Sequence, residues 1–254
     1  MSTMGIGLQL FSVRTQLESD FVGTLEKVAK AGYEGVEFAS NFGGMPAVEL
    51  RELLSKLGLQ VIGNHPGLPR LRDDLAEVVQ YHKDLGAPYA VAPWVPEEDR
   101  TAEKLPELAA LLDKSGEAFA KSGIQFGYHN HDFEFLTDVD GKFFFDALFA
   151  STSAAKVKVE LDVGWVYHAG QDPLAYMEKY ASRLPLVHLK DFAHDASGKW
   201  VSSPVGKGEV PTAKVISKAA EVGVKWLIVE QDFTQGDIFE DIEFTRGWLK
   251  ETYR

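Results

Sequence analysis

The sequence predicts an α/β protein that folds as a single (β/α)8 barrel of the TIM type. Amphipathic stretches alternate with short runs rich in Val, Ile, Leu and Phe, at a repeat of roughly 30 residues. Eight such pairs fit into the 254 residues, which is a usual length for a closed barrel of parallel strands. Residues 9–14, which follow the first predicted strand, contain no glycine. An open doubly wound sheet often carries a glycine-rich phosphate loop there, so the barrel is favoured.

The predicted strands after the first follow helical stretches with apolar residues that recur on one face, as Ala47, Leu50, Leu54 and Leu57 do. Five helical stretches end at a glycine, which tolerates the left-handed conformation of a helix cap: Gly32, Gly58, Gly86, Gly123 and Gly223. The predicted strands cover residues 5–10, 33–38, 59–64, 89–92, 124–129, 157–161, 185–190 and 225–230, and a last helix covers 238–253. No linker divides the chain, so residues 1–254 are predicted to form one domain.

The composition excludes several classes of protein. Hydrophobic residues make up 45%, which is enough to form a large core, so a disordered chain is excluded. The chain has no Cys, which excludes disulfides, Cys-based zinc sites and thiol catalysis. The formal net charge of −12 opposes binding to nucleic acid or an anionic membrane. The sequence also shows no membrane-spanning run and no signal peptide at residues 1–4, so a cytoplasmic location is expected.

Polar residues gather at the predicted carboxyl ends of the strands, where barrels of this kind hold their active sites. Four of the seven His residues fall there: His65, His129, His131 and His188. The same ends carry Glu37, Asn64, Trp94, Glu160, Asp162, Lys190, Asp191 and Glu230. The opposite ends of the strands carry nothing comparable.

This collection of imidazoles and carboxylates predicts a divalent metal site. The predicted ligands come from the last four strands: His129, Asp162, His188 and Glu230. Taken singly, each has an ordinary structural explanation, such as a helix cap for Asp162 or an ion pair with Lys190 for Glu230. Their occurrence on four consecutive strand ends is what favours a metal. The mixed donor set suits Mn, Co, Zn, Fe or Mg without a strong choice.

Further residues have candidate roles around that site. Glu134 and Lys190 are candidate acids or bases, while Glu37, Asn64 and His65 are candidate binders of substrate hydroxyls. Trp94, Trp165 and Phe11 would supply apolar walls for a sugar ring. Asp191 would orient His188 or cap the next helix. Residues 205–209 lack the spacing of a phosphate loop and are interpreted as a loop over the site.

The motifs at these strand ends resemble those of the sugar phosphate isomerase/epimerase family. This family belongs to the xylose isomerase-like TIM-barrel superfamily, with ketose 3-epimerases, inosose dehydratase, hydroxypyruvate isomerase and endonuclease IV. The resemblance is carried by Tyr128-His129-Asn130-His131-Asp132-Phe133-Glu134-Phe135, Leu161-Asp162-Val163-Gly164-Trp165, Val187-His188-Leu189-Lys190-Asp191, Val229-Glu230-Gln231-Asp232 and the opening residues 7–14.

The resemblance implies one divalent metal, manganese first, with Zn, Co, Fe and Mg as alternatives. Its ligands are typically Glu, Asp, His and Glu from the fifth to eighth strands. Asp162, His188 and Glu230 match that pattern, but His129, or alternatively His131, stands where ketose epimerases have Glu. Trp165 also replaces a His of the epimerase motif. In ketose epimerases, the two metal-bound glutamates also shuttle protons on opposite faces of the substrate. Of that pair, only Glu230 is present in this sequence.

The expected function is a metal-dependent isomerase or epimerase that acts through an enediolate on a small sugar or keto-polyol. The expected bases and acids are Glu230, His131, Glu134 and Lys190, in that order. The first alternative is a lyase of the inosose dehydratase type. Two weaker alternatives are an endonuclease IV-like enzyme and a non-catalytic sugar-binding barrel. The family resemblance also implies a homodimer or homotetramer.

Overall fold

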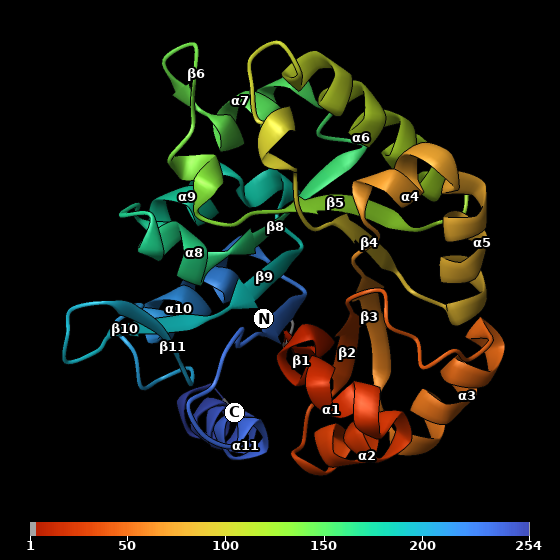
Figure 1. Ribbon diagram of the computed structural model, residues 1–254, viewed down its shortest axis with the longest axis vertical. Helices are drawn as coiled ribbons and strands as arrows, with labels where there is room; N and C mark the ends of the chain where they lie inside the picture. The colour runs from red at the N-terminus through yellow and green to blue at the C-terminus, as the bar shows by residue number, and fades with distance from the viewer. Residues whose placement is uncertain (1–3, 254) are drawn as a thin grey trace.

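A computed structural model describes residues 4–253, and its centre is an eight-stranded parallel sheet (Figure 1). The strands follow the order β3-β2-β1-β12-β9-β8-β5-β4. Their bounds are β1 Gly5–Gln9, β2 Gly35–Phe38, β3 Gln60–Asn64, β4 Tyr89–Ala92, β5 Gln125–His129, β8 Val157–Asp162, β9 Leu186–Leu189 and β12 Trp226–Val229. All eight predicted strands are present, and the predicted barrel class is confirmed. Residues 1–3, where the absence of a signal peptide was expected, lie outside the described residues.

The sheet curls until its two end strands, β3 and β4, approach each other. Gly63 of β3 lies so close to β4 that a Cβ atom added to it would stand 3.0 Å from the Tyr89 carbonyl oxygen. A larger residue at this position would push the two strands apart. All hydrogen-bonded neighbours in the sheet run parallel, so the carboxyl ends of the strands meet at one mouth.

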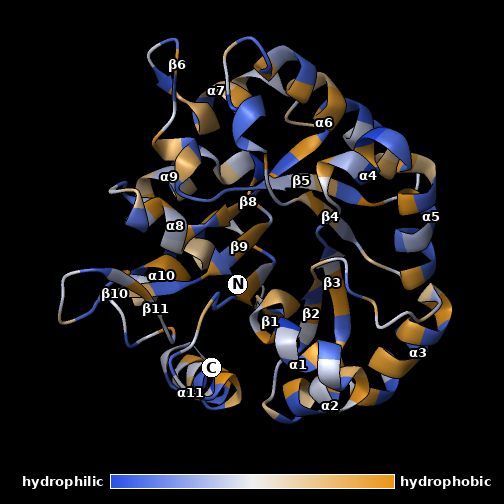
Figure 2. Ribbon diagram, in the orientation of Figure 1, coloured by the Kyte–Doolittle hydropathy of each residue, from blue (hydrophilic) through white to orange (hydrophobic). Residues whose placement is uncertain are grey.

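Helices surround the outside of the sheet (Figure 1). Their faces alternate between hydrophobic and hydrophilic residues (Figure 2), and in α3 the buried residues are Ala47, Leu50 and Leu54. The bounds are α1 Arg14–Ser19, α2 Phe21–Lys30, α3 Ala47–Leu57, α4 Leu68–Asp73, α5 Leu75–Leu85, α6 Leu105–Ala120, α7 Phe144–Ser151, α8 Val163–His168, α9 Pro173–Lys179, α10 Thr212–Val222 and α11 Ile238–Thr252. No helix within residues 4–253 is long and apolar enough to span a membrane.

The predicted strict alternation of eight strands with eight helices is wrong in detail: two helices follow each of β1, β3 and β8, and two hairpins are added. After β9 the chain forms an antiparallel hairpin of β10 (Asp191–His194) and β11 (Trp200–Ser203) before it enters α10. After β5 a short hairpin of β6 (Asp138–Val139) and β7 (Lys142–Phe143) precedes α7. Both hairpins are turned by a glycine with positive φ, Gly198 and Gly141. They extend two loops beyond the barrel.

Candidate metal centre and active site

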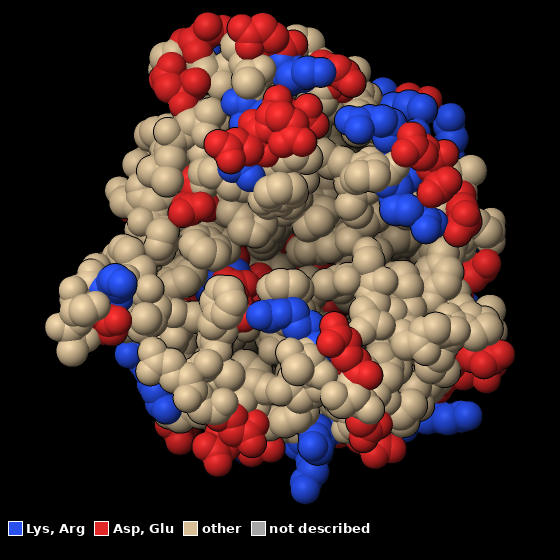
Figure 3. Space-filling model, viewed as in Figure 1, with Lys and Arg blue, Asp and Glu red and all other residues tan. Residues whose placement is uncertain are grey.

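The strand ends enclose a cavity of about 640 Å³ at the mouth of the barrel. In Figure 3, acidic side-chain atoms are visible inside a hollow near the centre of the molecular face. Side chains from several strands and loops line the cavity, among them His65, Trp94, His129, His131, Glu230 and Asp232. Of the residues predicted to act at the site, the cavity therefore contains three predicted to contact substrate (Phe11, His65 and Trp94), two predicted metal ligands and His131.

Four buried side chains converge on a position at which one ion could bind. The ligand-forming atoms of His129, Asp162, His188 and Glu230 all lie within 4.8 Å of one another. His129 ends β5, Asp162 ends β8, His188 lies in β9 and Glu230 directly follows β12. This is the set predicted from the sequence, with His129 rather than His131 as the contribution of the fifth strand.

The orientation of His188 is fixed by two carboxylates. Its Nε2–H donates to Glu37 Oε2 at 2.7 Å, and its Nδ1 lies 3.0 Å from Glu230 Oε2. A carboxylate that binds one ring nitrogen of a metal-ligating histidine positions the other nitrogen for the metal. Glu37, a predicted substrate binder, is fully buried and also accepts a hydrogen bond from Gln9 Nε2 at 2.9 Å. Glu37 therefore orients His188 and does not line the cavity.

Glu160 belongs to a second group that shares His129 and His188 with the first. His65, His129, Glu160 and His188 also bring their ligand-forming atoms within 4.8 Å of one another. His65 Nε2 lies 2.9 Å from Glu160 Oε2 and 3.1 Å from Glu37 Oε2. Burial opposes protonation of His65, but the two carboxylates outweigh it and raise its pKa to about 10. His65 therefore stays positively charged at neutral pH and neutralises part of the buried acid.

Lys190 lies between the carboxylates on the other side of the site. Its Nζ is 3.1 Å from Asp162 Oδ2, 3.0 Å from Glu230 Oε2 and 2.9 Å from Asp232 Oδ2. Burial opposes the charged form, yet the three acids raise the pKa of Lys190 above its usual value. The ammonium is thus a fixed positive charge and a poor proton donor.

The charges and donor types of the site suit a divalent cation. Glu37, Glu160, Asp162, Glu230 and Asp232 place five carboxylates around the Lys190 ammonium and the cationic His65, so negative charge is in excess. The carboxylates raise the pKa of His188, which would lose a proton on binding a metal. Burial and the neighbouring His188 lower the pKa of His129 to about 3. A neutral imidazole has the free lone pair that a metal requires. The buried His/Asp/Glu cluster could therefore hold a metal.

The other residues predicted to act differ in their access to the cavity. His131 lines it, stacks on Phe133 at 5.9 Å and has a pKa well below the usual value because of burial and the nearby His129. Trp94 lines it with 46% of its surface exposed. Glu134 is buried beside it, where its oxygens accept hydrogen bonds from Tyr128 Oη at 2.6 Å and from the His131 backbone N–H at 2.8 Å. Burial raises the pKa of Glu134 to about 8.

Comparison with known proteins now gives the family. The family model described as "Xylose isomerase-like TIM barrel" matches residues 25–251. The chain belongs to this family. An inosose dehydratase from Geobacillus kaustophilus is 25% identical over 246 residues, and the match covers 82% of this chain and 79% of that protein. A second inosose dehydratase, from Clostridium tetani, is 32% identical over 168 residues, or 59% of this chain and 55% of that protein.

Solved structures agree with the family fold. A sugar phosphate isomerase/epimerase from Parabacteroides distasonis superposes with a TM-score of 0.84 at 24% identity, covering 98% of this chain and 94% of that chain. At this identity the likeness supports the xylose isomerase-like fold alone.

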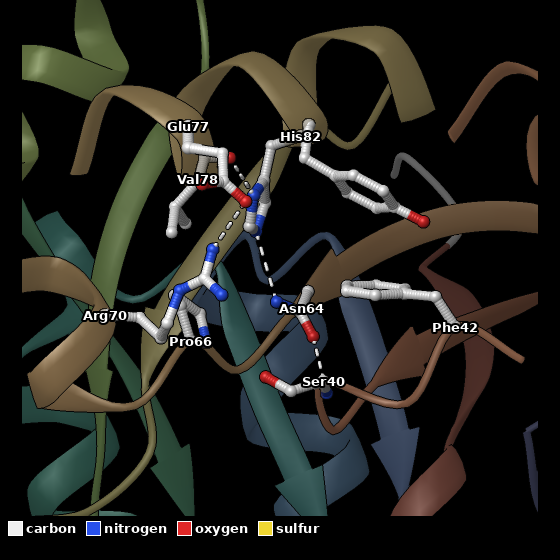
Figure 4. Close-up of a pocket in the computed structure, with 9 residues that line it drawn as sticks. Ser40, Phe42, Asn64, Pro66, Arg70, Glu77, Val78 and His82 are labelled. Carbon is white, nitrogen blue, oxygen red and sulfur yellow. Dashed lines mark hydrogen bonds and ion pairs between the residues drawn. The ribbon is translucent and has the colours of Figure 1, made fainter. Parts of the chain in front are cut away.

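In this member of the xylose isomerase-like family, Asn64 supports the mouth rather than facing its cavity. Its Oδ1 accepts the Ser40 N–H at 2.8 Å, and its Nδ2 lies 3.4 Å from Nε2 of His82 (Figure 4). These residues line a smaller cavity of about 260 Å³ between β3, α4 and α5, which also contains Phe42 and Arg70. Asn64, considered from the sequence as a binder of substrate hydroxyls, fixes the loop after β2 through Ser40.

Asp191 neither orients His188 nor caps a helix, as the sequence had suggested it would. It accepts four backbone N–H groups, from Phe192, Gly206, Gly208 and Val210, at 2.9 to 3.0 Å. Within residues 205–209, the amides of Gly206 and Gly208 are thus bound to a carboxylate of the protein itself. Asp191 fastens this loop to the end of β9.

Sequence reasoning missed Asp232 as a wall of the cavity and gave Glu160 no role. Glu160 lies two residues before Asp162 on β8, and strand periodicity places both side chains on the same face. That periodicity was the available signal for Glu160. Asp232 lies beyond the end of β12, where no periodicity constrains it.

Proposed function

We propose that this protein is a metal-dependent lyase that acts on a keto-polyol or small keto-sugar. It would remove a proton from the carbon next to the carbonyl and then eliminate the β-hydroxyl group. The observation that supports this proposal is the convergence of His129, Asp162, His188 and Glu230 at the base of one open cavity. A divalent metal held there, manganese first among the candidates, would polarise the carbonyl and acidify the neighbouring C–H group.

The side chains around the cavity have the properties that this reaction needs. His131 lines the cavity, and its low pKa makes it a neutral base at physiological pH. Glu230 lines the same cavity, and the Lys190 ammonium beside it helps to hold its pKa well below the usual value. Trp94 offers a flat apolar wall for the carbon skeleton of the substrate. Glu134, which binds the His131 backbone, would position that base rather than contact substrate.

Elimination is favoured over epimerisation by the fifth strand. An epimerase with two glutamate bases needs a second carboxylate opposite Glu230, and this chain has His129 there. The relatives from Geobacillus kaustophilus and Clostridium tetani are named inosose dehydratases, and a dehydratase is a lyase that eliminates water. Both observations support a lyase.

An isomerase or epimerase is the second candidate. Glu230 follows β12 and His131 follows β5, so the two side chains reach the cavity from different strand ends and could act on two sides of one substrate. Returning the abstracted proton to a neighbouring carbon or to the other face would then give an isomer or epimer instead of an unsaturated product.

One experiment separates these outcomes. An inosose is incubated in D₂O with protein loaded with Mn, Zn, Co, Fe or Mg, and proton NMR follows the C–H signal next to the carbonyl. We expect that signal to disappear, with new ultraviolet absorbance from the unsaturated product of a lyase. Exchange without new absorbance would indicate the isomerase or epimerase. His131→Gln and Glu230→Gln should each slow exchange at least about 100-fold. Metal-loaded protein that causes no exchange in any keto-polyol or keto-sugar would refute the proposal.

A further inference from the structure

A second cavity of about 300 Å³ lies beside the mouth of the barrel. It is bounded by α8, by the β10–β11 hairpin and by the loop that follows β12. Aromatic rings form most of its wall: Trp165, His168, Phe192, Trp200 and Phe233. None of the predicted metal ligands lines it. Trp165, which was predicted to contact substrate, lines this second cavity rather than the first.

The rings of the second cavity pack against one another as a rigid wall. Trp165 lies 4.8 Å from Phe192, and His168 lies 5.6 Å from Trp200, measured between ring centroids. Phe233 adds a further ring to the lining and is 70% exposed. Large aromatic faces that remain open to a cavity are the surfaces on which the C–H faces of flat rings pack.

Polar groups interrupt this aromatic wall. Within residues 4–253, the buried Nε1 of Trp165 and the buried Oγ of Ser202 have no hydrogen-bond partner. Thr234 and Gln235 add further polar groups to the lining. The combination suits a ring that has apolar faces and hydroxyls at its edge.

Asp232 joins the two cavities, because it lines both of them. Its Oδ2 is held at 2.9 Å by Lys190 Nζ, which in turn lies 5.0 Å from the Trp165 ring centroid. Trp165 also lies 5.8 Å from the ring of His131, the candidate base in the first cavity. Asp232, Lys190 and Trp165 therefore place the second cavity next to the first.

We propose that the second cavity is a subsite for a hydroxylated ring joined to the ring that reacts. The substrate class would then be a two-ring carbohydrate, with its keto-bearing ring in the first cavity and a sugar ring against Trp165 and Trp200. This inference rests on the proposed function for the identity of the reacting ring. The second ring is assigned from the lining of its own cavity.

The test measures binding, by isothermal calorimetry at millimolar ligand, with probes that cannot react. Cellobiose, which has two joined sugar rings, is compared with glucose and with phenyl β-glucoside. We expect cellobiose to bind about tenfold more tightly than glucose, the order of effect given by packing one ring on aromatic walls. Equal binding of cellobiose and glucose would overturn the proposal. Tighter binding of phenyl β-glucoside than of cellobiose would also overturn it, since the occupant would then be an aromatic group.

Two variants test whether the tighter binding of cellobiose arises in the second cavity. Trp200→Ala removes a wall, and Ser202→Leu fills the cavity while leaving the wall in place. Each should reduce the ratio of cellobiose to glucose affinity to about one, with glucose binding unchanged. Trp94→Ala, a matched aromatic change in the first cavity, should weaken both ligands and preserve the ratio. An unchanged ratio in both cavity variants would refute the assignment.

Failure of this inference is distinguishable from failure of the proposed function. The exchange experiment with an inosose uses a one-ring substrate and depends on the first cavity alone. Exchange with no preference for two rings would leave the lyase proposal intact and remove the subsite. A two-ring preference without exchange would leave the subsite intact and remove the lyase proposal.

Discussion

Lys190 is the residue on which the electrostatics of the site depend most directly. Its ammonium contacts Asp162, Glu230 and Asp232 and is 1% exposed. Two of these acids belong to the predicted metal-binding group. A bound metal and Lys190 would therefore neutralise the same carboxylates from different sides, and the lysine alone would do so when no metal is bound.

Replacing Lys190 with methionine should make the protein depend on metal for its stability. Lys190→Met keeps the length of the side chain but leaves buried acids without their cation, so the free energy of unfolding without metal should fall by about 3–5 kcal/mol. Urea denaturation in the presence of a chelator measures this loss, and repeating it with Mn should restore much of it. Lys156→Met, which breaks only an exposed pair with Glu117, should cost less than about 1 kcal/mol. A loss from Lys190→Met no larger than this control would contradict the expected role.

At the scale of the element, the eight sheet strands could be predicted but the added hairpins could not. Strands covered by helices are continuous apolar runs, and glycines with positive φ, such as Gly58 and Gly86, mark the ends of the helices before them. The residues of β10 and β11 mix aromatic, charged and small side chains and form no apolar run. The two strands pair because of Asp191 and the turn at Gly198. Neither feature produces a periodic pattern of hydrophobic residues in the sequence.

Asp191 should control the order of the loop after the β10–β11 hairpin. Asp191→Ala removes the acceptor of four backbone N–H groups, of which those of Phe192 and Val210 are buried. We expect the free energy of unfolding to fall by about 2–4 kcal/mol, and trypsin to cleave faster at the exposed Lys207. Asp195→Ala is the matched control, because its carboxylate also accepts several hydrogen bonds but lies in an exposed turn. Equal losses in the two variants would indicate that burial of Asp191 has no special effect.

Helix α5 carries a histidine that should make folding sensitive to acid. His82 is buried, donates from Nδ1 to the Val78 carbonyl at 2.7 Å, and has a pKa lowered to about 4 chiefly by burial. The unfolded chain binds a proton at His82 below about pH 6.5, while the folded chain does not until about pH 4. The contribution of His82 to the free energy of unfolding is therefore fully present above pH 6.5. It is lost as the pH falls toward 4, and the total loss is about 3 kcal/mol.

The variant His82→Gln, which cannot titrate, isolates this contribution. Urea denaturation of wild type and variant at several pH values between 4 and 7 gives two stability curves. The wild-type curve should fall more steeply with acid, by up to about 1.4 kcal/mol per pH unit. Parallel curves would show that His82 is not the group responsible.

At the scale of the whole molecule, the candidate site is assembled from both halves of the barrel. The convergence of four side chains could be predicted because His129, Asp162, His188 and Glu230 fall at or near the ends of consecutive sheet strands. Strand order alone does not report how deep a side chain lies inside the barrel. Only closure of the sheet brings Glu37 of β2 within 2.7 Å of His188 in β9, so its buried orienting contacts could not be read from the sequence.

Because the predicted ligands come from four different strands, metal binding should stabilise the entire fold. An ion that binds the folded chain alone, at 100 times its dissociation constant, adds about 2.7 kcal/mol to the free energy of unfolding. For a domain of this size that corresponds to a rise in Tm of about 5–10 °C. Calorimetric scans with chelator and with Mn measure the shift, and mass spectrometry of the purified protein should find about one metal ion per chain. Asp162→Ala and Glu230→Ala should abolish both the shift and the bound metal, whereas Glu117→Ala on the surface should preserve them. A wild-type Tm that no divalent metal raises, in protein that contains none, would leave the sugar-binding barrel without catalysis as the better explanation of this cavity.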